Sequence, residues 1–159
     1  MSQDARFEEA NEYPLNLGAF DQENLEVVSS LLQDAVLPVT EISWRPRQRR
    51  LVLLVNRFRW EEKDKAIAEG RPFERVQSLF LVENVLSMSS QSINRKNNNL
   101  VLSLLSLDVQ TAKKGDLYLL ITFAGEGFLR ARVEAIEVTL KDVTRPYKAQ
   151  SSQTPKHPE

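Results

Sequence analysis

Six arginines and two tryptophans are concentrated between positions 44 and 60. Binding by these side chains is the chemistry that the sequence suggests most directly. They are Trp44, Arg45, Arg47, Arg49, Arg50, Arg57, Arg59 and Trp60. No acidic residue interrupts the run from Arg45 to Arg59. Arginine presents a fork of donors that suits phosphate and carboxylate groups, and tryptophan offers a stacking surface. The segment therefore predicts a site for a phosphate, an acidic peptide or a nucleic-acid backbone.

A second interpretation of the same residues needs no ligand. Arginines along an exposed strand keep neighbouring chains from pairing with it, and both tryptophans would then lie in the core. In either case, two apolar runs around a break at Pro46 have the pattern of a β-hairpin. Strand alternation places Val52 and Leu54 on the core face and Arg57 and Arg59 on the solvent face.

The residues on which most catalytic mechanisms depend at neutral pH are missing. The chain has no cysteine, and its one histidine, His157, lies in a polar segment at the C-terminus. Histidine- or cysteine-based nucleophiles and ordinary histidine or thiolate metal sites are therefore excluded from the fold. The five glycines match neither a dinucleotide fingerprint nor a phosphate-binding loop. We expect no metal and no cofactor.

Paired carboxylates are the remaining route to catalysis. Glu134 and Glu137 are one helical turn apart, and Asp34, Glu61 and Glu83 lie near the ends of predicted elements. Nothing in the sequence places these groups in a cleft that would raise a pKa. We therefore expect a non-catalytic binding or scaffold module, with a small acid–base hydrolase or an anionic-ligand binder as the alternatives.

Length and composition predict one domain. The chain has 159 residues, 42% of them hydrophobic, and a net charge of -1, which is enough to bury one sizeable core. We divide it into a flexible acidic arm (1–13), a single domain (14–146) and a disordered tail (147–159). The N-terminal residues have no apolar run typical of a secretory signal, and no stretch is long enough to span a membrane. We expect a cytoplasmic location.

Apolar periodicity predicts an α+β fold. Asp21 is a suitable N-cap for a helix over 22–35, and residues 14–20 are a candidate edge strand. The expected strands that follow are 36–44, 50–60, 73–83, 85–91, 100–109, 117–124 and 128–134. Between Val133 and Val143, helical spacing competes with strand alternation, and we favour a helix. The prediction is a curved antiparallel sheet or barrel of six to seven strands with an N-terminal and a C-terminal helix; an antiparallel β-sandwich with two helices is the alternative.

Several short segments resemble a family of small uncharacterised alphaproteobacterial proteins. The segments are Leu25 to Ser29, Gln33 to Val36, Asn56 to Glu61, Val101 to Leu105, Phe123 to Gly127 and Val133 to Glu137. The resemblance implies a bacterial, cytoplasmic, single-domain protein and transfers no catalytic residue, because the family is a domain of unknown function.

The expected order of elements is also similar to that of pleckstrin-homology-like barrels, in which the first hairpin is often basic and binds phosphorylated head groups. This likeness concerns the architecture only and does not establish a function. An unknown protein is the expected partner, an anionic ligand is a further candidate, and a homodimer is compatible with the sequence.

Overall fold

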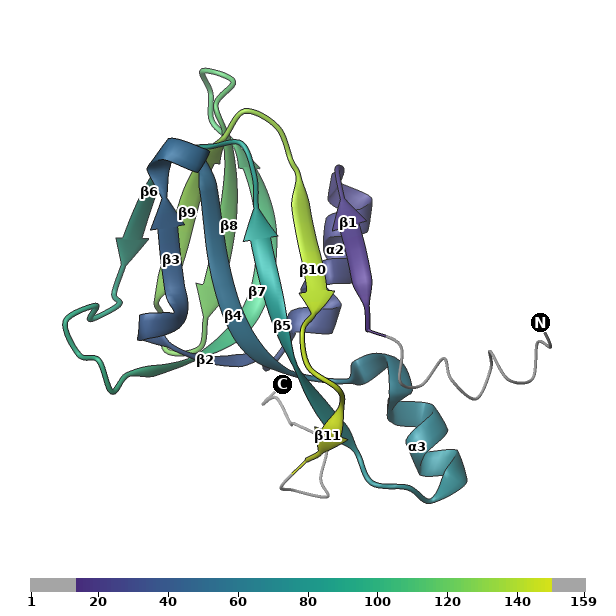
Figure 1. Ribbon diagram of the computed structural model, residues 1–159. Helices are drawn as coiled ribbons and strands as arrows, with labels where there is room; N and C mark the ends of the chain where they lie inside the picture. Colours follow the sequence, from purple (N-terminus) through teal and green to yellow (C-terminus); the bar gives the residue numbers. More distant parts are fainter. Residues whose placement is uncertain (1–13, 150–159) are drawn as a thin grey trace.

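Antiparallel strands make up most of the structure, a computed structural model that describes residues 14–149 (Figure 1). The strands are β1 (Asn16–Ala19), β2 (Val36–Pro38), β3 (Ile42–Arg45), β4 (Arg50–Phe58), β5 (Glu74–Val82), β6 (Val85–Gln91), β7 (Val101–Thr111), β8 (Leu117–Phe123), β9 (Phe128–Val133), β10 (Val138–Asp142) and β11 (Tyr147–Lys148). Two α-helices, α2 (Gln22–Leu32) and α3 (Lys63–Glu69), and three short 3-10 turns, η1 (Val39–Glu41), η2 (Pro46–Gln48) and η3 (Trp60–Glu62), connect them.

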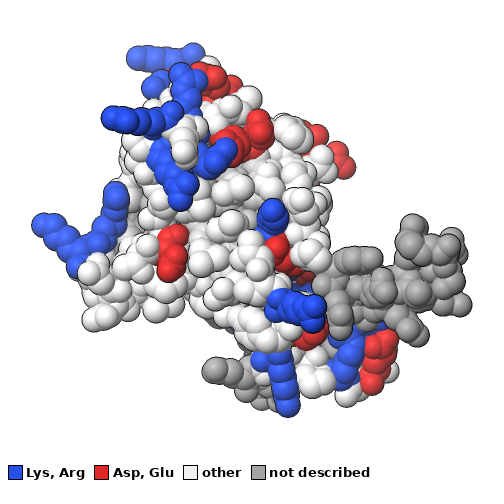
Figure 2. Space-filling view, viewed as in Figure 1, with Lys and Arg blue, Asp and Glu red and all other residues white. Residues whose placement is uncertain are grey.

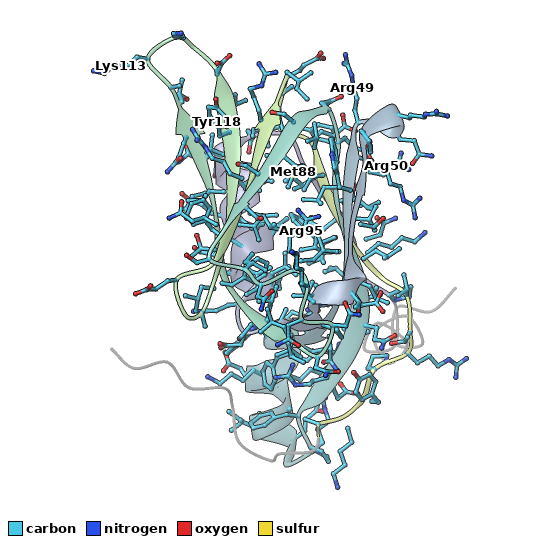
Figure 3. The ribbon with its side chains drawn as sticks, turned by 90° about the vertical axis from the view of Figure 1, so that its left-hand side faces the viewer. Arg49, Arg50, Met88, Arg95, Lys113 and Tyr118 are labelled. Carbon is cyan, nitrogen blue, oxygen red and sulfur yellow. The ribbon has the colours of Figure 1, made fainter. Side chains whose placement is uncertain are left out.

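All described strands belong to one sheet that bends over on itself without closing. Its order is β1-β10-β5-β4-β2-β7-β8-β9-β6, with β3 paired to β4 and β11 paired to β5. The short strand β2 joins the two halves, because Val36 pairs with Asn56 of β4 on one side and with Ser103 of β7 on the other. The halves face each other in Figures 1 and 3, and the core lies between them.

Helix α2 packs against the sheet beside β1 and β7. Its first turn is capped by Asp21, whose side chain accepts a hydrogen bond from the backbone N–H of Asn24 at 2.8 Å. Leu25, Val28 and Leu32 are buried at helical spacing. The predicted helix 22–35 is therefore present but ends at Leu32, because the following residues leave helical geometry and the chain enters β2.

The predicted fold class is wrong. Within residues 14–149, eleven strands form one unclosed antiparallel sheet. We expected a curved sheet or barrel of six to seven strands with an N-terminal and a C-terminal helix, or a β-sandwich with two helices. The expected C-terminal helix is strand β10, in which buried Val138, Leu140 and Asp142 alternate with the less buried Thr139 and Lys141. Leu140 pairs with Phe80 of β5 and Leu17 of β1. With a strand there, the element order of a pleckstrin-homology-like barrel is lost.

The core face of β4 is the opposite of the predicted one. Leu51, Leu53 and Val55 are at most 1% exposed, whereas Val52 and Leu54 are only half-buried on the outer face. The buried face continues into arginine at the end of the strand, so the charged residues point inward. Asn84, in the left-handed region at a φ of 58°, lies in the bend that connects β5 to β6.

The C-terminal part of the described chain is paired to the sheet. Tyr147 and Lys148 form β11 opposite Arg75 and Glu74, and Ala149 donates its backbone N–H to Phe73. The predicted disordered tail, 147–159, thus differs from the structure at its first residues. The rest of that tail, and the predicted arm 1–13, lie outside the described residues.

Candidate anion-binding surface

The β3–β4 hairpin carries four of the predicted arginines to one end of the sheet. Pro46 starts the 3-10 turn η2, and Arg49 ends it in the left-handed region at a φ of 53°. The backbone N–H of Arg49 donates to the carbonyl of Pro46 at 3.1 Å, which closes the turn. Arg45, Arg47 and Arg49 are exposed as a consequence, and Arg50 is half-buried at the start of β4.

Two of these arginines are already paired. Arg49 Nη1 lies 2.7 Å from Glu134 Oε1, and Arg50 Nε lies 2.7 Å from Glu83 Oε1. Arg45 donates to the hydroxyl of Ser43 at 3.4 Å. Within residues 14–149, neither Arg45 nor Arg47 has a carboxylate at ion-pair distance. These two side chains are therefore available to an anionic partner.

Further cations lie near the same end of the molecule. Lys113 and Lys114 are exposed in the turn between β7 and β8, and Figure 3 places Lys113 at the same end as Arg49 and Arg50, on the facing half of the sheet. Lysine and arginine side chains gather over this region in Figure 2, with a few acidic side chains among them.

The outer face of β8 and β9 adds two more arginines that sequence reasoning missed. Arg130 and Arg132 alternate with buried residues on β9. The guanidinium carbon of Arg130 lies 3.7 Å from the ring centroid of Tyr118, while Arg132 Nε is 3.4 Å from the hydroxyl of Ser87. The alternation in 128–133 could have revealed their outward direction, but not their proximity to β6.

The two tryptophans lie near opposite ends of β4. Trp44 on β3 packs against the core. Trp60 lies beyond the other end of β4, where its indole N–H donates to the carbonyl of Gln33 at 2.9 Å and its ring contacts Phe58 at a centroid distance of 4.7 Å. The predicted stacking surface is thus not assembled at the turn.

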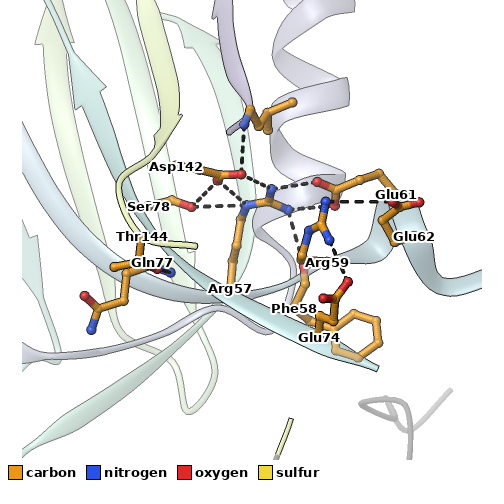
Figure 4. Close-up of polar contacts among 11 residues, drawn as sticks. Arg57, Phe58, Arg59, Glu61, Glu62, Glu74, Gln77, Ser78, Asp142 and Thr144 are labelled. Atoms are coloured by element: carbon orange, nitrogen blue, oxygen red, sulfur yellow. Dashed lines mark hydrogen bonds and ion pairs between the residues drawn. The ribbon is translucent and has the colours of Figure 1, made fainter. Parts of the chain in front are cut away.

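Arg57 is fully buried in a network that joins β4, β5 and β10 to the turn η3 and to the residue before β1 (Figure 4). Its guanidinium binds both oxygens of Glu61 at 2.8 and 2.7 Å and both oxygens of Asp142 at 3.2 and 3.1 Å. Asp142 also accepts from the Ser78 hydroxyl at 2.6 Å and from the backbone N–H of Leu15 at 2.9 Å. The predicted solvent location of Arg57 is wrong because these acceptors satisfy its charge inside the fold.

The network fixes the ionisation of its outer carboxylate. Burial by itself would raise the pKa of Glu61, but the hydrogen bond and positive charge of Arg57 outweigh it and hold the pKa below its ordinary value. Burial would likewise lower the pKa of Arg57, and the bonds and charges of Glu61 and Asp142 outweigh that effect, so its pKa is raised. Both groups are charged at neutral pH, and their contacts stabilise the fold by holding the strands and the turn η3 together.

Arg59 is also buried, at 4% exposed, so its predicted solvent location is wrong too. It contacts Glu74 at 2.6 Å and Glu62 at 3.8 Å. Arg71 approaches the same two carboxylates, at 3.5 and 3.9 Å, and ties the end of α3 to β5. Seven residue steps of extended strand separate Arg50 from Arg57, which is about 23 Å. The structure therefore brings together the turn arginines and leaves Arg57 and Arg59 elsewhere.

A shallow groove lies between α2 and β7, with a volume of about 290 Å³. Its lining residues include the carboxylates Glu26 and Asp108 and the hydroxyl of Ser29, which accepts the backbone N–H of Leu107 at 2.9 Å. This wall is acidic and polar, so it does not extend the basic surface. In the described part of the chain, no group of three or more metal-ligating side chains occurs.

Comparison with known proteins gives a family. The family model described as "Protein of unknown function (DUF2948)" matches residues 15–157. The chain belongs to this family. No curated protein and no solved structure gave a significant match. The DUF2948 match covers every described strand, and it assigns no role to the arginine turn or to the buried network. No helix among residues 14–149 is long and apolar enough to cross a membrane.

Proposed function

We propose that this DUF2948 chain is a non-catalytic binding module that contacts a negatively charged partner through the β3–β4 turn. The observation that carries the proposal is the difference between neighbouring arginines. Arg49 and Arg50 are held by Glu134 and Glu83, whereas Arg45 and Arg47 project into solvent without a carboxylate among the described residues. Each of these two exposed guanidinium groups can donate to a phosphate or a carboxylate of a partner.

The lowered pKa values of two carboxylates, Glu61 and Glu69, favour a binding module over an acid–base hydrolase. A general acid that works at neutral pH needs a raised pKa. The hydrogen bond and charge of Arg71 lower the pKa of exposed Glu69, and the pKa of Glu61 is lowered as well. Both carboxylates with a shifted pKa therefore stay ionised at neutral pH, and Glu61 is engaged by buried Arg57.

The setting we propose for this module is the cytoplasm of an alphaproteobacterium. The absence of cysteine from the 159 residues suits a reducing compartment. The resemblance of the Asn56 to Glu61 and Gln33 to Val36 segments to alphaproteobacterial proteins supports the source. We expect the partner to be another protein.

The test is a charge reversal at the free arginines. The double variant Arg45→Glu, Arg47→Glu is compared with Lys141→Glu, Arg145→Glu, which changes the net charge equally at exposed positions on and after β10. Binding of a fluorescent polyglutamate peptide and of a single-stranded oligonucleotide is measured over a range of salt concentrations.

The turn variant is expected to weaken the preferred probe about tenfold and to flatten its salt dependence, since two exposed ion pairs become repulsive. The control pair should bind as the parent protein does. Equal losses in both variants would show that only net charge matters, and unchanged binding in the turn variant would place the site elsewhere.

A further inference from the structure

The free edge of β6 differs from the other edges of the sheet. Natural proteins protect exposed edge strands with charges, prolines, bulges or short lengths. Among the described edges, β1 has four residues and follows Pro14, β3 has four and ends in Arg45, and β11 has two and includes Lys148. β6 has seven residues with neither a charge nor a proline, and its one irregularity lies before Ser87.

The backbone of this edge is open to a further strand. Ser87 to Gln91 pair regularly with β9, so alternate residues direct their N–H and C=O groups away from β9. Within residues 14–149, the one backbone hydrogen bond that β6 makes on this outer side runs from Val85 N–H to the carbonyl of Arg49 at 2.9 Å. Beyond Val85 the outer groups are left for solvent or for a partner.

Positive charge surrounds the edge. Arg132 and Arg130 stand opposite Ser87 and Ser89 on the adjacent strand, and within the described chain neither has a carboxylate at ion-pair distance. The Nε of Arg130 is buried without an acceptor. Exposed Arg95 follows β6 in the next loop. Figure 3 shows Met88 of β6, Arg49, Arg50 and Arg95 on one side of the molecule.

We propose that the partner is an acidic peptide in extended conformation that adds to the free edge of β6 as a new antiparallel or parallel strand. This inference rests on the proposed function and specifies its partner. Main-chain hydrogen bonds to β6 would provide affinity, as in other cases of strand addition. Acidic side chains at alternate positions of the peptide would project on the outer face toward Arg130 and Arg132, which provides the selection for charge.

The same surface fits single-stranded nucleic acid less well. Such ligands bind by stacking bases on exposed aromatic rings. One face of Tyr118 is covered by Arg130, Trp44 packs against the core, and Trp60 lies at the other end of β4. A phosphodiester backbone can accept from N–H groups but has no N–H donors for the carbonyls, so it cannot form the paired ladder of an added strand.

The experiment uses the full chain and a labelled peptide in which glutamate alternates with valine. Three matched probes accompany it: the same peptide N-methylated at every residue, so that neither edge of the extended peptide keeps a donor, its lysine-for-glutamate analogue, and a single-stranded oligonucleotide. N-methylation retains the charge but removes the backbone donors. Affinity is measured by fluorescence anisotropy, and backbone amide shifts and hydrogen exchange are followed by NMR.

The glutamate peptide is expected to bind at least tenfold more tightly than its N-methylated and lysine analogues, and to shift and protect amides from Met88 to Gln91. The variant Arg130→Gln, Arg132→Gln, checked for native structure by circular dichroism, should lose most of this preference. Lys141→Gln, Arg145→Gln is its control.

The outcomes separate this inference from the proposed function. Equal binding of the methylated and unmethylated peptides, with sensitivity to Arg45→Glu, Arg47→Glu, would overturn strand addition and leave an anion-binding turn. Amide protection on another edge would also overturn it. Tighter binding of the oligonucleotide would identify the partner as nucleic acid instead. If none of the probes binds, both proposals fail.

Discussion

Removing Asp142 should be among the most destabilising single changes in this fold. The side chain accepts two hydrogen bonds from Arg57, one from the Ser78 hydroxyl and one from the backbone N–H of Leu15. Asp142→Leu leaves these buried donors without that acceptor, although Arg57 keeps Glu61. Breaking a buried ion pair on one side costs about 3 to 5 kcal/mol, a large part of the ~5 to 15 kcal/mol that stabilises a typical domain.

The assay is urea unfolding followed by tryptophan fluorescence, with Arg57→Met, Asp142→Leu and the double variant compared. Each single change is expected to cost about 3 to 5 kcal/mol, and the double change much less than the sum of the two, since it removes both charges together. Lys141→Ala, at an exposed neighbouring position on β10, should stay within about 0.5 kcal/mol of the parent. Additive losses, or a single loss below about 1 kcal/mol, would refute the argument that the pair is one buried unit.

Three further predictions concern acid stability, packing and the C-terminal strand. The pKa of Glu61 is lowered in the folded state. The contribution of ionised Glu61 to the free energy of unfolding is therefore complete above its unfolded pKa of about 4.3 and is lost as the pH falls through the lower folded pKa. Glu61→Gln should be destabilising at pH 7, and the urea midpoints of the variant and the parent protein should converge in acid. Gly127→Ala places a Cβ 2.9 Å from Ile93 Cγ1 and should cost about 1 to 3 kcal/mol by thermal unfolding, whereas Gly18→Ala, with 3.7 Å to its nearest neighbour, should be tolerated; equal losses would contradict this. Leu140→Ala should cost about 2 to 5 kcal/mol in urea and Thr139→Ala far less, a contrast that a solvated helix would not give.

Local signals predicted several elements because the interactions that define them are local. Asp21 caps α2 through a residue three positions later, and the β3–β4 hairpin follows from two apolar runs around Pro46. In each case the residues that determine the structure are near one another in the sequence.

The errors arose where two periods or two faces were equally apolar. Helical spacing holds for Val133, Ile136, Leu140 and Val143, whereas strand alternation holds for Ile136, Val138 and Leu140. The outcome depends on the edge of β5 with which β10 pairs, and that edge is distant in the sequence. From Leu51 to Val55 both faces of β4 are apolar, so alternation alone cannot tell which face is buried in the core between the two halves of the sheet.

The candidate site was predictable only in part. The turn arginines are adjacent in sequence, and a hairpin places them together. Their division into paired and free charges depends on Glu83 and Glu134, which arrive from the ends of β5 and β9. For Arg57, the i,i+4 spacing to Glu61 was a usable signal, but Asp142 is 85 residues away.

The pairing of β1 with β10 has a consequence for synthesis of the protein. β1 is among the first described segments to be translated, yet its partner strand begins at Val138, and the bond from Leu15 to Asp142 spans 127 residues. Contacts between such distant segments form slowly. During translation, the nascent chain must therefore carry α2 and the buried charge of Arg57 without their final neighbours. A ribosome stalled before Val138 would hold a chain whose β5 edge is uncovered, which makes this interval the one in which a chaperone is most needed.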